Sequence, residues 1–264
     1  MKQRIITGVI AGAGFLGLIY IGGAAFIILV TALALIGMRE LLKMKQIQPF
    51  SFKGAVGFIL LLLLVVPDVL LVQLPWEVDR LELFLLLVIC LLALTVLSKN
   101  KFTFDEAGFT VLASVYVGFG FYYFMYARFL DNGMELLFFI LILVWATDSG
   151  AYFAGRAFGK TKLWPEISPK KTIEGSLGGI ALALTAGMIY YYFIPVYPNV
   201  WTAVAGIVVV STAGQLGDLV ESAFKRHYAV KDSGQVLPGH GGILDRFDSL
   251  IFVMPVLYLF GLLG

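Results

Sequence analysis

The sequence predicts an all-α integral membrane protein with about nine transmembrane helices and a cytoplasmic N-terminus. Three observations lead to this prediction. Of the 264 residues, 60% are hydrophobic and only 14% are charged, and the mean hydropathy of +0.93 lies well above that of soluble domains. Several apolar stretches reach the roughly 20 residues that a helix needs to cross the hydrocarbon core. The basic residues are distributed very unevenly among the polar segments between these stretches.

The predicted spans follow one another with short polar breaks. They cover residues 5–21, 24–42, 54–73, 81–98, 107–128, 134–155, 175–195, 200–221 and 246–263. The first two are separated at Gly22-Gly23, because residues 5–38 are too long for one crossing and paired glycines favour a turn. The next three are rich in Leu, Ile, Val and Phe and contain few polar residues. The last four carry or adjoin acidic residues at one end.

The basic residues indicate the orientation, because Lys and Arg in short loops are retained on the cytoplasmic side. With the N-terminus inside, 17 of the 19 Lys and Arg fall in cytoplasmic segments, and only Arg80 and Arg128 fall outside. The net charge of +2 therefore hides a basic cytoplasmic face. The single cysteine, Cys90, excludes a disulfide within the chain and a metal site built from cysteines.

The chain divides into two regions of different character. Residues 1–133 are predicted to form an N-terminal transmembrane scaffold that contacts lipid or provides the interface of a homodimer. Residues 134–264 are predicted to be the catalytic transmembrane region, with cytoplasmic loops at 156–174 and 222–245. No internal repeat is evident, so an inverted-repeat transporter has no support from sequence symmetry.

Two pairs of carboxylates border the second loop. Asp218 and Glu221 lie three residues apart near the end of one predicted helix, so they share a helical face. Asp245 and Asp248 repeat this spacing at the start of the next helix. Buried carboxylates in a membrane are costly unless they are paired or bind a cation. Because oxygen ligands favour Mg²⁺, the two pairs predict a magnesium site.

An alternative gives these carboxylates structural roles. Asp245 and Asp248 would favour a helix N-terminus through its dipole. Asp218 would pair with Lys225 or Arg226. Neither role accounts for the Gly-His-Gly-Gly run between the two pairs, so the magnesium site is the preferred interpretation.

The segment between the carboxylate pairs is predicted to bind phosphate. Its glycines allow backbone N–H groups to approach phosphate oxygens, and its cations neutralise their charge. The positive-inside rule explains some of these basic residues without any function. The candidate phosphate-binding residues are Ser222, Lys225, Arg226, Lys231, His240, Gly241 and Gly242.

The first loop is predicted to bind phosphate as well. Asp148 precedes it within an otherwise apolar span and requires a cationic partner or a metal ion. Hydroxyls and cations follow immediately before a predicted helix start, where anions are favoured. These residues are Ser168, Lys170, Lys171 and Thr172. In the alternative, the loop contacts anionic lipid headgroups.

The segment from Ser222 to Asp248, SAFKRHYAVKDSGQVLPGHGGILDRFD, resembles the C-terminal signature of the phosphatidate cytidylyltransferases, also called CDP-diacylglycerol synthases. The resemblance runs through all 27 positions without a gap. The segment from Asp148 to Gly179 is also similar to that family, through Ser-Pro-Lys-Lys-Thr at 168–172. The first half of the chain agrees mainly in hydropathy.

The resemblance implies the reaction CTP + phosphatidate → CDP-diacylglycerol + pyrophosphate, which serves phospholipid biosynthesis. It implies Mg²⁺ as cofactor, with a second cation such as K⁺. The implied partners are CTP, phosphatidate and membrane lipids, and nucleic acid is not among them. The expected location is the bacterial inner membrane, with the active site facing the cytoplasm.

The candidate residues are assigned to this reaction as follows. Catalysis is assigned to Asp218, Asp245, Asp248, Lys225 and Arg226. The metal ligands are Asp218, Asp245 and Asp248, supported by Glu221 and Asp148. The remaining polar residues of both loops would bind substrate, and Lys170 and Lys171 would contact either the lipid phosphate or CTP.

Two other functions stay open at this point. A CTP-dependent kinase of a membrane alcohol would also need a cation, CTP and a lipid acceptor, and its products distinguish it. A cation transporter would use the intramembrane carboxylates as an ion pathway. It predicts acidic residues through the whole depth of the membrane, whereas these residues cluster near the predicted cytoplasmic side.

Overall fold

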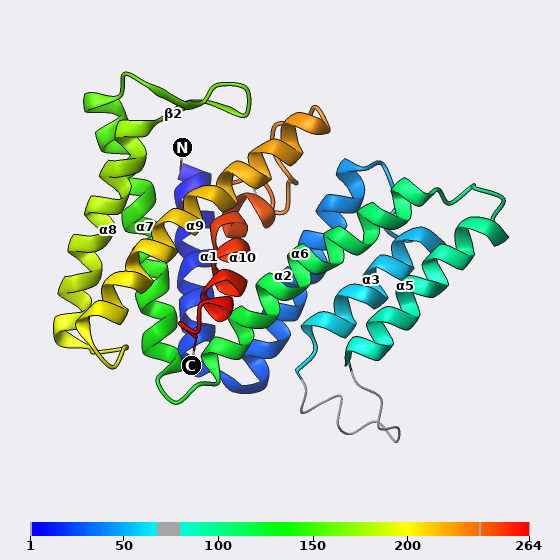
Figure 1. The fold of residues 1–264 in the computed structure, drawn as a ribbon, viewed down its shortest axis with the longest axis horizontal. Helices are drawn as coiled ribbons and strands as arrows, with labels where there is room; N and C mark the ends of the chain where they lie inside the picture. Colours follow the sequence, from blue (N-terminus) through cyan, green and yellow to red (C-terminus); the bar gives the residue numbers. More distant parts are fainter. Residues whose placement is uncertain (1, 68–79, 238, 264) are drawn as a thin grey trace.

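The computed structural model describes residues 2–67, 80–237 and 239–263. Residues 68–73, which end the predicted third span, and Pro238 of the signature segment lie outside this part. The described part contains nine helices and one two-stranded hairpin (Figure 1). The helices are α1 (Lys2–Ile21), α2 (Gly23–Met44), α3 (Phe52–Val65), α5 (Arg80–Leu97), α6 (Phe104–Arg128), α7 (Gly133–Phe158), α8 (Ile173–Phe193), α9 (Val200–His227) and α10 (Leu244–Leu259).

Each predicted span corresponds to one of these helices, which confirms an all-α polytopic membrane protein. Five helices, α2, α6, α7, α8 and α9, have the length and hydropathy of a full membrane span. The apolar runs in α1, α3 and α5 are shorter, and α10 has 16 residues. The predicted break at Gly22-Gly23 is confirmed, because both glycines have positive φ angles, of 66° and 57°.

Polar side chains cap several helices at their first turn. In α6, Thr103 Oγ1 accepts a hydrogen bond from the Glu106 backbone N–H at 3.2 Å, and Glu106 Oε2 accepts one from the Thr103 N–H at 3.0 Å. Lys53 Nζ lies 2.7 Å from the same carboxylate. Thr172 and Asn199 cap α8 and α9 with their side-chain oxygens. These caps satisfy backbone N–H groups that have no partner within their helix.

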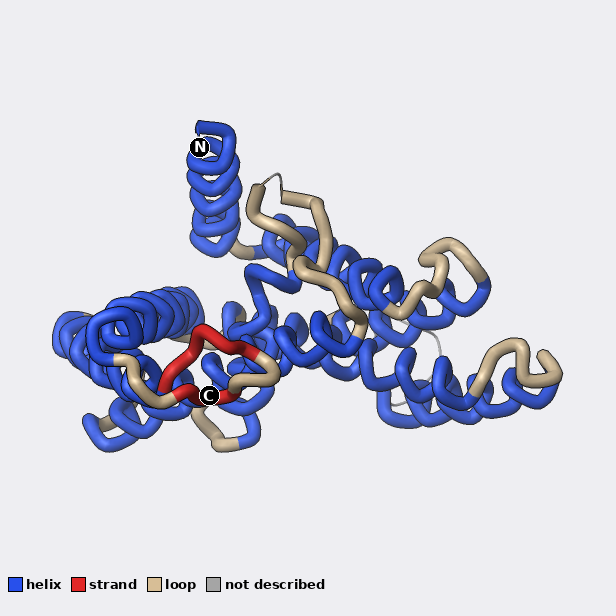
Figure 2. Tube along the Cα trace, turned by 90° about the horizontal axis from the view of Figure 1, so that it is seen from above, coloured by secondary structure: helices blue, strands red, loops and turns tan. Residues whose placement is uncertain are grey.

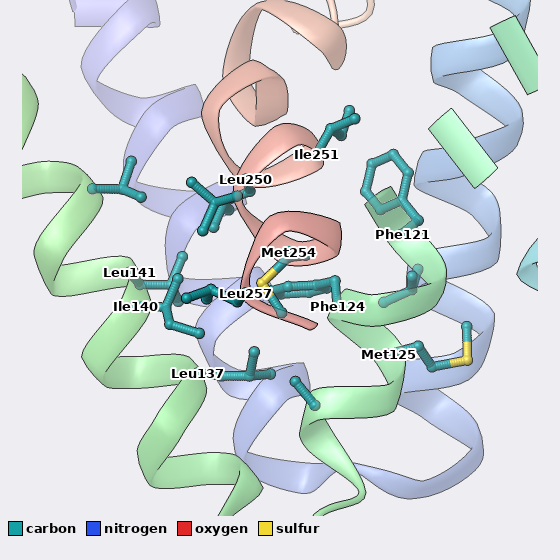
Figure 3. Close-up of a cluster of buried hydrophobic side chains, with 14 of the residues drawn as sticks. Phe121, Phe124, Met125, Leu137, Ile140, Leu141, Leu250, Ile251, Met254 and Leu257 are labelled. Atoms are coloured by element: carbon teal, nitrogen blue, oxygen red, sulfur yellow. The ribbon is translucent and has the colours of Figure 1, made fainter. Parts of the chain in front are cut away.

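The main core forms around α10, which lies between α6 and α7 in the close-up of Figure 3. The labelled side chains come from α6 (Phe121, Phe124, Met125), α7 (Leu137, Ile140, Leu141) and α10 (Leu250, Ile251, Met254, Leu257). All are buried. Because lipid is as apolar as these side chains, close packing rather than removal from water stabilises the bundle. This packing fixes α10, and with it the carboxylates at its start.

Helices α7 and α8 approach closely through small residues. A Cβ added to Gly178 would collide with Ala154, and a Cβ added to Gly150 would come within 2.6 Å of the Gly178 carbonyl oxygen. Small residues permit such close contact between membrane helices. The hairpin that connects the two helices is therefore held beside the Asp148 end of α7.

The first predicted loop contains a β-hairpin, which the sequence did not reveal. Strands β1 (Lys162–Trp164) and β2 (Ser168–Thr172) pair antiparallel. Glu174 accepts hydrogen bonds from the backbone N–H groups of Lys160 and Thr161, both at 3.1 Å. These bonds tie the start of the hairpin to the first turn of α8.

The second predicted loop, at 222–245, is shorter in the structure. Helix α9 continues to His227, and α10 begins at Leu244. Lys225 and Arg226 therefore lie on the last turn of α9, so their positions are set by the helix.

The segments predicted to be cytoplasmic lie at one end of the molecule. Figure 1 places the hairpin, the N-terminal end of α1 and the C-terminal end of α9 at the top, and the C-terminus and the α8–α9 connection at the bottom. Figure 2 shows the loop between α9 and α10 beside α1. A Cβ added to Gly8 of α1 would lie 3.1 Å from His240 Nε2 in that loop. The polar segments thus share one end, where they can form a single site.

Candidate active site

An ion pair joins the hairpin to α9. Lys171 Nζ, on β2, lies 2.6 Å from Asp218 Oδ2. Ser222 Oγ, one turn further along α9, donates to Asp218 Oδ1 at 3.3 Å. Arg226 Nε donates to the carbonyl oxygen of Ile167 in the hairpin at 3.2 Å. The alternative in which Asp218 pairs with Lys225 or Arg226 is therefore wrong.

Three carboxylates from three helices, one of them Asp218 of this ion pair, interact electrostatically with one another. Asp248 on α10 interacts electrostatically with Asp218 on α9 and with Asp148 on α7, and Asp148 also interacts with Asp218. The cationic side chains of Lys171 and Arg246 offset part of the repulsion at Asp148. Lys225 offsets part of the repulsion at Asp248 in the same way, so basic side chains from the hairpin, α9 and α10 surround the three carboxylates.

Lys225 and Asp245 form a second, more buried ion pair. Lys225 Nζ lies 2.8 Å from Asp245 Oδ1 and also contacts the carboxylate of Glu221, one turn earlier on α9. The Glu221 side chain is 1% exposed. Within the described residues, Lys225 is its ion-pair partner and its oxygens accept no other hydrogen bond. A buried carboxylate of this kind requires a cation nearby, and Lys225 supplies one.

Both oxygens of Asp245 are occupied by donors. Oδ1 accepts from Lys225, and Oδ2 accepts from the backbone N–H groups of Ser233 and Gly242, each at 2.8 Å. Asp245 therefore holds the α9–α10 loop against the start of α10, which agrees with the structural alternative for this residue. Asp248 differs, because its one hydrogen bond within the described residues comes from the Ser249 N–H, at 2.7 Å.

A cavity opens beside the hairpin, which we call the hairpin cavity. It has a volume of about 400 Å³ and lies between α7, α8, α9 and β2. Its lining includes the predicted residues Asp148, Lys170, Lys171, Thr172 and Asp218. The structure thus brings the first predicted phosphate-binding loop together with Asp218 of α9, whereas Ser168 and the candidate residues of the second segment lie outside this lining.

A second cavity, the loop cavity, is formed by the connection between α9 and α10. It has a volume of about 730 Å³. Its lining includes the predicted residues Lys231, His240 and Gly241, together with Arg246. Arg246 also interacts electrostatically with Asp148, which lines the hairpin cavity. Arg246 therefore lines the loop cavity and also acts electrostatically on a carboxylate of the hairpin cavity.

The carboxylate oxygens of this site are ligands of the kind that a hard divalent cation prefers. Within the described residues, no group of three or more His, Cys, Asp or Glu side chains is arranged as a ready-made metal site. Mg²⁺ usually takes one or two carboxylates together with substrate phosphates, so it does not need such a group. Asp148, Asp218 and Asp248 fit this requirement in charge and ligand type. The oxygens of Asp218 and Asp245 are less available, because donors already occupy both oxygens of each residue.

Two residues beside the site were not predicted. The carboxylate of Glu40 on α2 accepts hydrogen bonds from the start of α10, and Ser233 bonds to both Glu40 and Asp245. One signal in the sequence pointed to Glu40, namely an acidic residue within the apolar span at 24–42. Ser233 carries no comparable signal, because a serine in a polar loop is common.

The fold and the site define a polytopic membrane protein with carboxylates and cations arranged to bind phosphate-bearing ligands at one end of its helix bundle. The chain matches the model of the cytidylyltransferase family over residues 2–263 and belongs to that family. This match confirms the family expected from the signature segment.

Curated relatives cover almost the whole chain. A phosphatidate cytidylyltransferase of Bacillus subtilis (strain 168) is 49% identical over 261 residues, which are 98% of this chain and 96% of the relative. Phosphatidate cytidylyltransferases of Staphylococcus aureus (strain COL) and Staphylococcus epidermidis (strain ATCC 12228 / FDA PCI 1200) are each 44% identical over 258 residues, which are 97% of this chain and 97% of each relative. The similarity therefore extends through the first half of the chain.

Proposed function

We propose that this protein transfers the cytidylyl group of CTP to phosphatidate, which yields CDP-diacylglycerol and pyrophosphate for phospholipid biosynthesis. Family membership and the names of the relatives support this activity. The observation that carries it is that Asp148 and Asp218, which act electrostatically on Asp248, line a cavity with Lys170 and Lys171, while a second cavity contains Lys231 and Arg246. A reaction between two phosphate-bearing substrates needs basic side chains to bind the phosphates and carboxylates to bind a cation.

The chemistry requires positioning and charge neutralisation. An oxygen of the lipid phosphate attacks the α-phosphorus of CTP, and the bond from that phosphorus to the bridging oxygen of pyrophosphate breaks. The nucleophile comes from the substrate, so no side chain has to form a covalent intermediate. Bound Mg²⁺ would neutralise phosphate charge, with a second cation such as K⁺ as a further expectation of the resemblance.

The two cavities suggest places for the two substrates. The loop cavity, with Lys231, His240 and the backbone of Gly241, takes the triphosphate of CTP in this proposal, because it is the larger and its glycines allow close approach. The hairpin cavity takes the lipid phosphate, with Lys170 and Lys171 as counter-ions. Tyr152 lines this cavity and is 60% exposed, so the proposal takes its side as the place where the lipid enters.

The proposal places the enzyme in the bacterial inner membrane with this site facing the cytoplasm. The basic segments support that orientation. CTP is a cytoplasmic nucleotide, and the acyl chains of phosphatidate would stay in the bilayer while the headgroup reaches the carboxylates. The homodimer anticipated for residues 1–133 remains part of the proposal and is testable by the mass of the purified protein in detergent.

The deciding experiment is a product assay with purified protein in detergent–lipid micelles. CTP labelled at the α-phosphorus and supplied with phosphatidate and Mg²⁺ should transfer its label to a lipid product that comigrates with CDP-diacylglycerol, with pyrophosphate released. Chelation of Mg²⁺ should stop the transfer. Release of CDP with a phosphorylated lipid alcohol would instead indicate a kinase, and ion flux into liposomes without CTP would indicate a transporter.

A further inference from the structure

A buried carboxylate from the predicted scaffold region reaches the candidate active site. Glu40, near the end of α2, is 3% exposed. Its Oε1 accepts a hydrogen bond from the backbone N–H of Ile243 at 2.9 Å. Its Oε2 accepts from the N–H of Leu244 at 3.0 Å and from Ser233 Oγ at 2.8 Å. All three partners are donors, as an ionised carboxylate requires.

Glu40 takes the place of a local cap for α10. The N-cap residue of α10, Ile243, has no side-chain oxygen and makes no side-chain capping bond. The first N–H groups of a helix have no partner within the helix, and the helix dipole favours a negative charge there. Glu40 satisfies two of these N–H groups from another helix, about 200 residues away in the chain.

The loop sequence accommodates this carboxylate closely. A Cβ added to Gly234 would fall against the Glu40 side chain, and a Cβ added to Gly242 would fall against both Glu40 and Ser233. Both glycines leave the space that the carboxylate occupies. The glycines at 234 and 242 thus serve contact with Glu40 as well as any approach of the loop to phosphate.

Glu40 and Asp245 hold the same segment. The Ser233 hydroxyl lies 2.8 Å from Glu40 Oε2 and 3.0 Å from Asp245 Oδ2. Asp245 in turn binds Lys225 at 2.8 Å on α9. The chain of contacts from α2 through the loop to α9 therefore fixes the walls of the loop cavity, whose lining begins at Lys231 and ends at Arg246.

We propose that Glu40 is a positioning residue for the loop cavity: it fixes the loop at 233–243 and the start of α10, and thereby sets the geometry in which CTP is bound. For its kinetic readout this inference rests on the proposed function. It assigns a role in the reaction to the half of the chain that was predicted to be scaffold.

The kinetic test compares three variants. Glu40→Gln keeps the size of the side chain, but whichever way the amide is turned, its N–H₂ faces the backbone N–H of Ile243 or Leu244. We expect kcat/KM for CTP to fall roughly tenfold to a hundredfold, the factor that corresponds to one hydrogen bond to a charged group. Glu40→Asp keeps the charge and should recover part of this loss. Glu106→Gln, a matched change of another helix-capping carboxylate, should stay within about twofold of wild type.

The structural test is amide hydrogen exchange of the purified protein without substrate. Glu40→Gln should accelerate exchange at 233–245 while the amides of α7 and α8 keep their wild-type rates. Wild-type kinetics and wild-type exchange at 233–245 would overturn the inference. A second outcome would also overturn it: Glu40→Gln loses activity only in proportion to the loss of folded protein, and Glu40→Asp shows no recovery.

Two outcomes need a separate readout. If Glu40→Gln does not fold, Ser233→Ala removes the hydroxyl that contacts both Glu40 and Asp245, while each carboxylate keeps its backbone donors. It should show the same pattern with a smaller change, and unchanged exchange and kinetics in Ser233→Ala would contradict the inference. If wild type makes no CDP-diacylglycerol, the proposed function fails, but the exchange experiment still decides whether Glu40 fixes the loop.

Discussion

At the scale of single residues, the two carboxylates at the start of α10 have different tasks. Asp245 is surrounded by donors from Ser233, Gly242 and Lys225. Asp248 faces the carboxylates of the two neighbouring helices instead. Their spacing of three residues suggested one metal site for both, but a spacing cannot show which neighbouring groups already occupy an oxygen. The contacts divide them into Asp245, which organises the loop, and Asp248, which acts on the carboxylates of α7 and α9.

Asp248→Asn should remove activity and leave the fold intact. The substitution takes one negative charge from the group that would hold a cation, while the Ser249 N–H can still bond to the amide oxygen. We expect kcat to fall about a hundredfold to a thousandfold, as when one preorganised electrostatic group is lost. The measurement is CDP-diacylglycerol formation at saturating Mg²⁺, with Asp131→Asn at the opposite end of the molecule as control. Near-normal kcat in Asp248→Asn would exclude it from the reaction.

Asp245→Asn should instead lower stability. Its amide N–H₂ would face either Lys225 or the N–H groups of Ser233 and Gly242, so at least one donor loses its acceptor. The loss of a hydrogen bond to a charged group costs about 1.5–3 kcal/mol. Thermal unfolding in detergent should therefore begin at a lower temperature than in Asp248→Asn. Equal stability of the two variants would contradict the division of roles.

At the scale of elements, the helices were predictable and the hairpin was not. Runs of about 20 apolar residues reveal membrane helices because length and hydropathy are local properties. Strand β2, Ser168–Thr172, has no alternation of apolar and polar residues, so nothing in it suggests a strand. The prediction ended α9 too early because the last turn of this helix is polar, and hydropathy does not distinguish a polar helical turn from a loop. The signature segment pointed to the site, whereas its contact with Glu40 depends on tertiary packing.

The hairpin should become locally less stable when its ion pair with α9 is removed. Lys171 binds Asp218, and the side chains of this pair are 25% and 35% exposed. Ion pairs this exposed contribute at most about 1 kcal/mol, so Lys171→Ala should leave global unfolding almost unchanged. Amide exchange at 160–172 should nevertheless become faster without substrate. Lys162→Ala, on the other strand of the hairpin, is the control, and equal exchange in both variants would contradict the anchor.

At the scale of the whole molecule, the polar segments that carry the candidate site lie at one end of the helix bundle. The hairpin and the C-terminal end of α9 lie at one end, opposite the α8–α9 connection (Figure 1). The N-terminal half also contributes to the site through Glu40. A lipid headgroup and a nucleotide would meet at the ends of helices from both halves. The position of this end relative to the cytoplasm therefore decides whether CTP reaches the site.

Labelling of single cysteines should show that the hairpin faces the cytoplasm. In a Cys90→Ala background, Asp131→Cys lies in the exposed turn before α7, and Glu166→Cys lies in the exposed turn of the hairpin, at opposite ends of α7. A membrane-impermeant maleimide applied to spheroplasts should label Asp131→Cys at once, and Glu166→Cys only after the membrane is opened. The basic residues on the hairpin side are the physical reason, because they are retained on the cytoplasmic face. Labelling of Glu166→Cys in sealed spheroplasts would reverse the orientation and separate the site from cytoplasmic CTP.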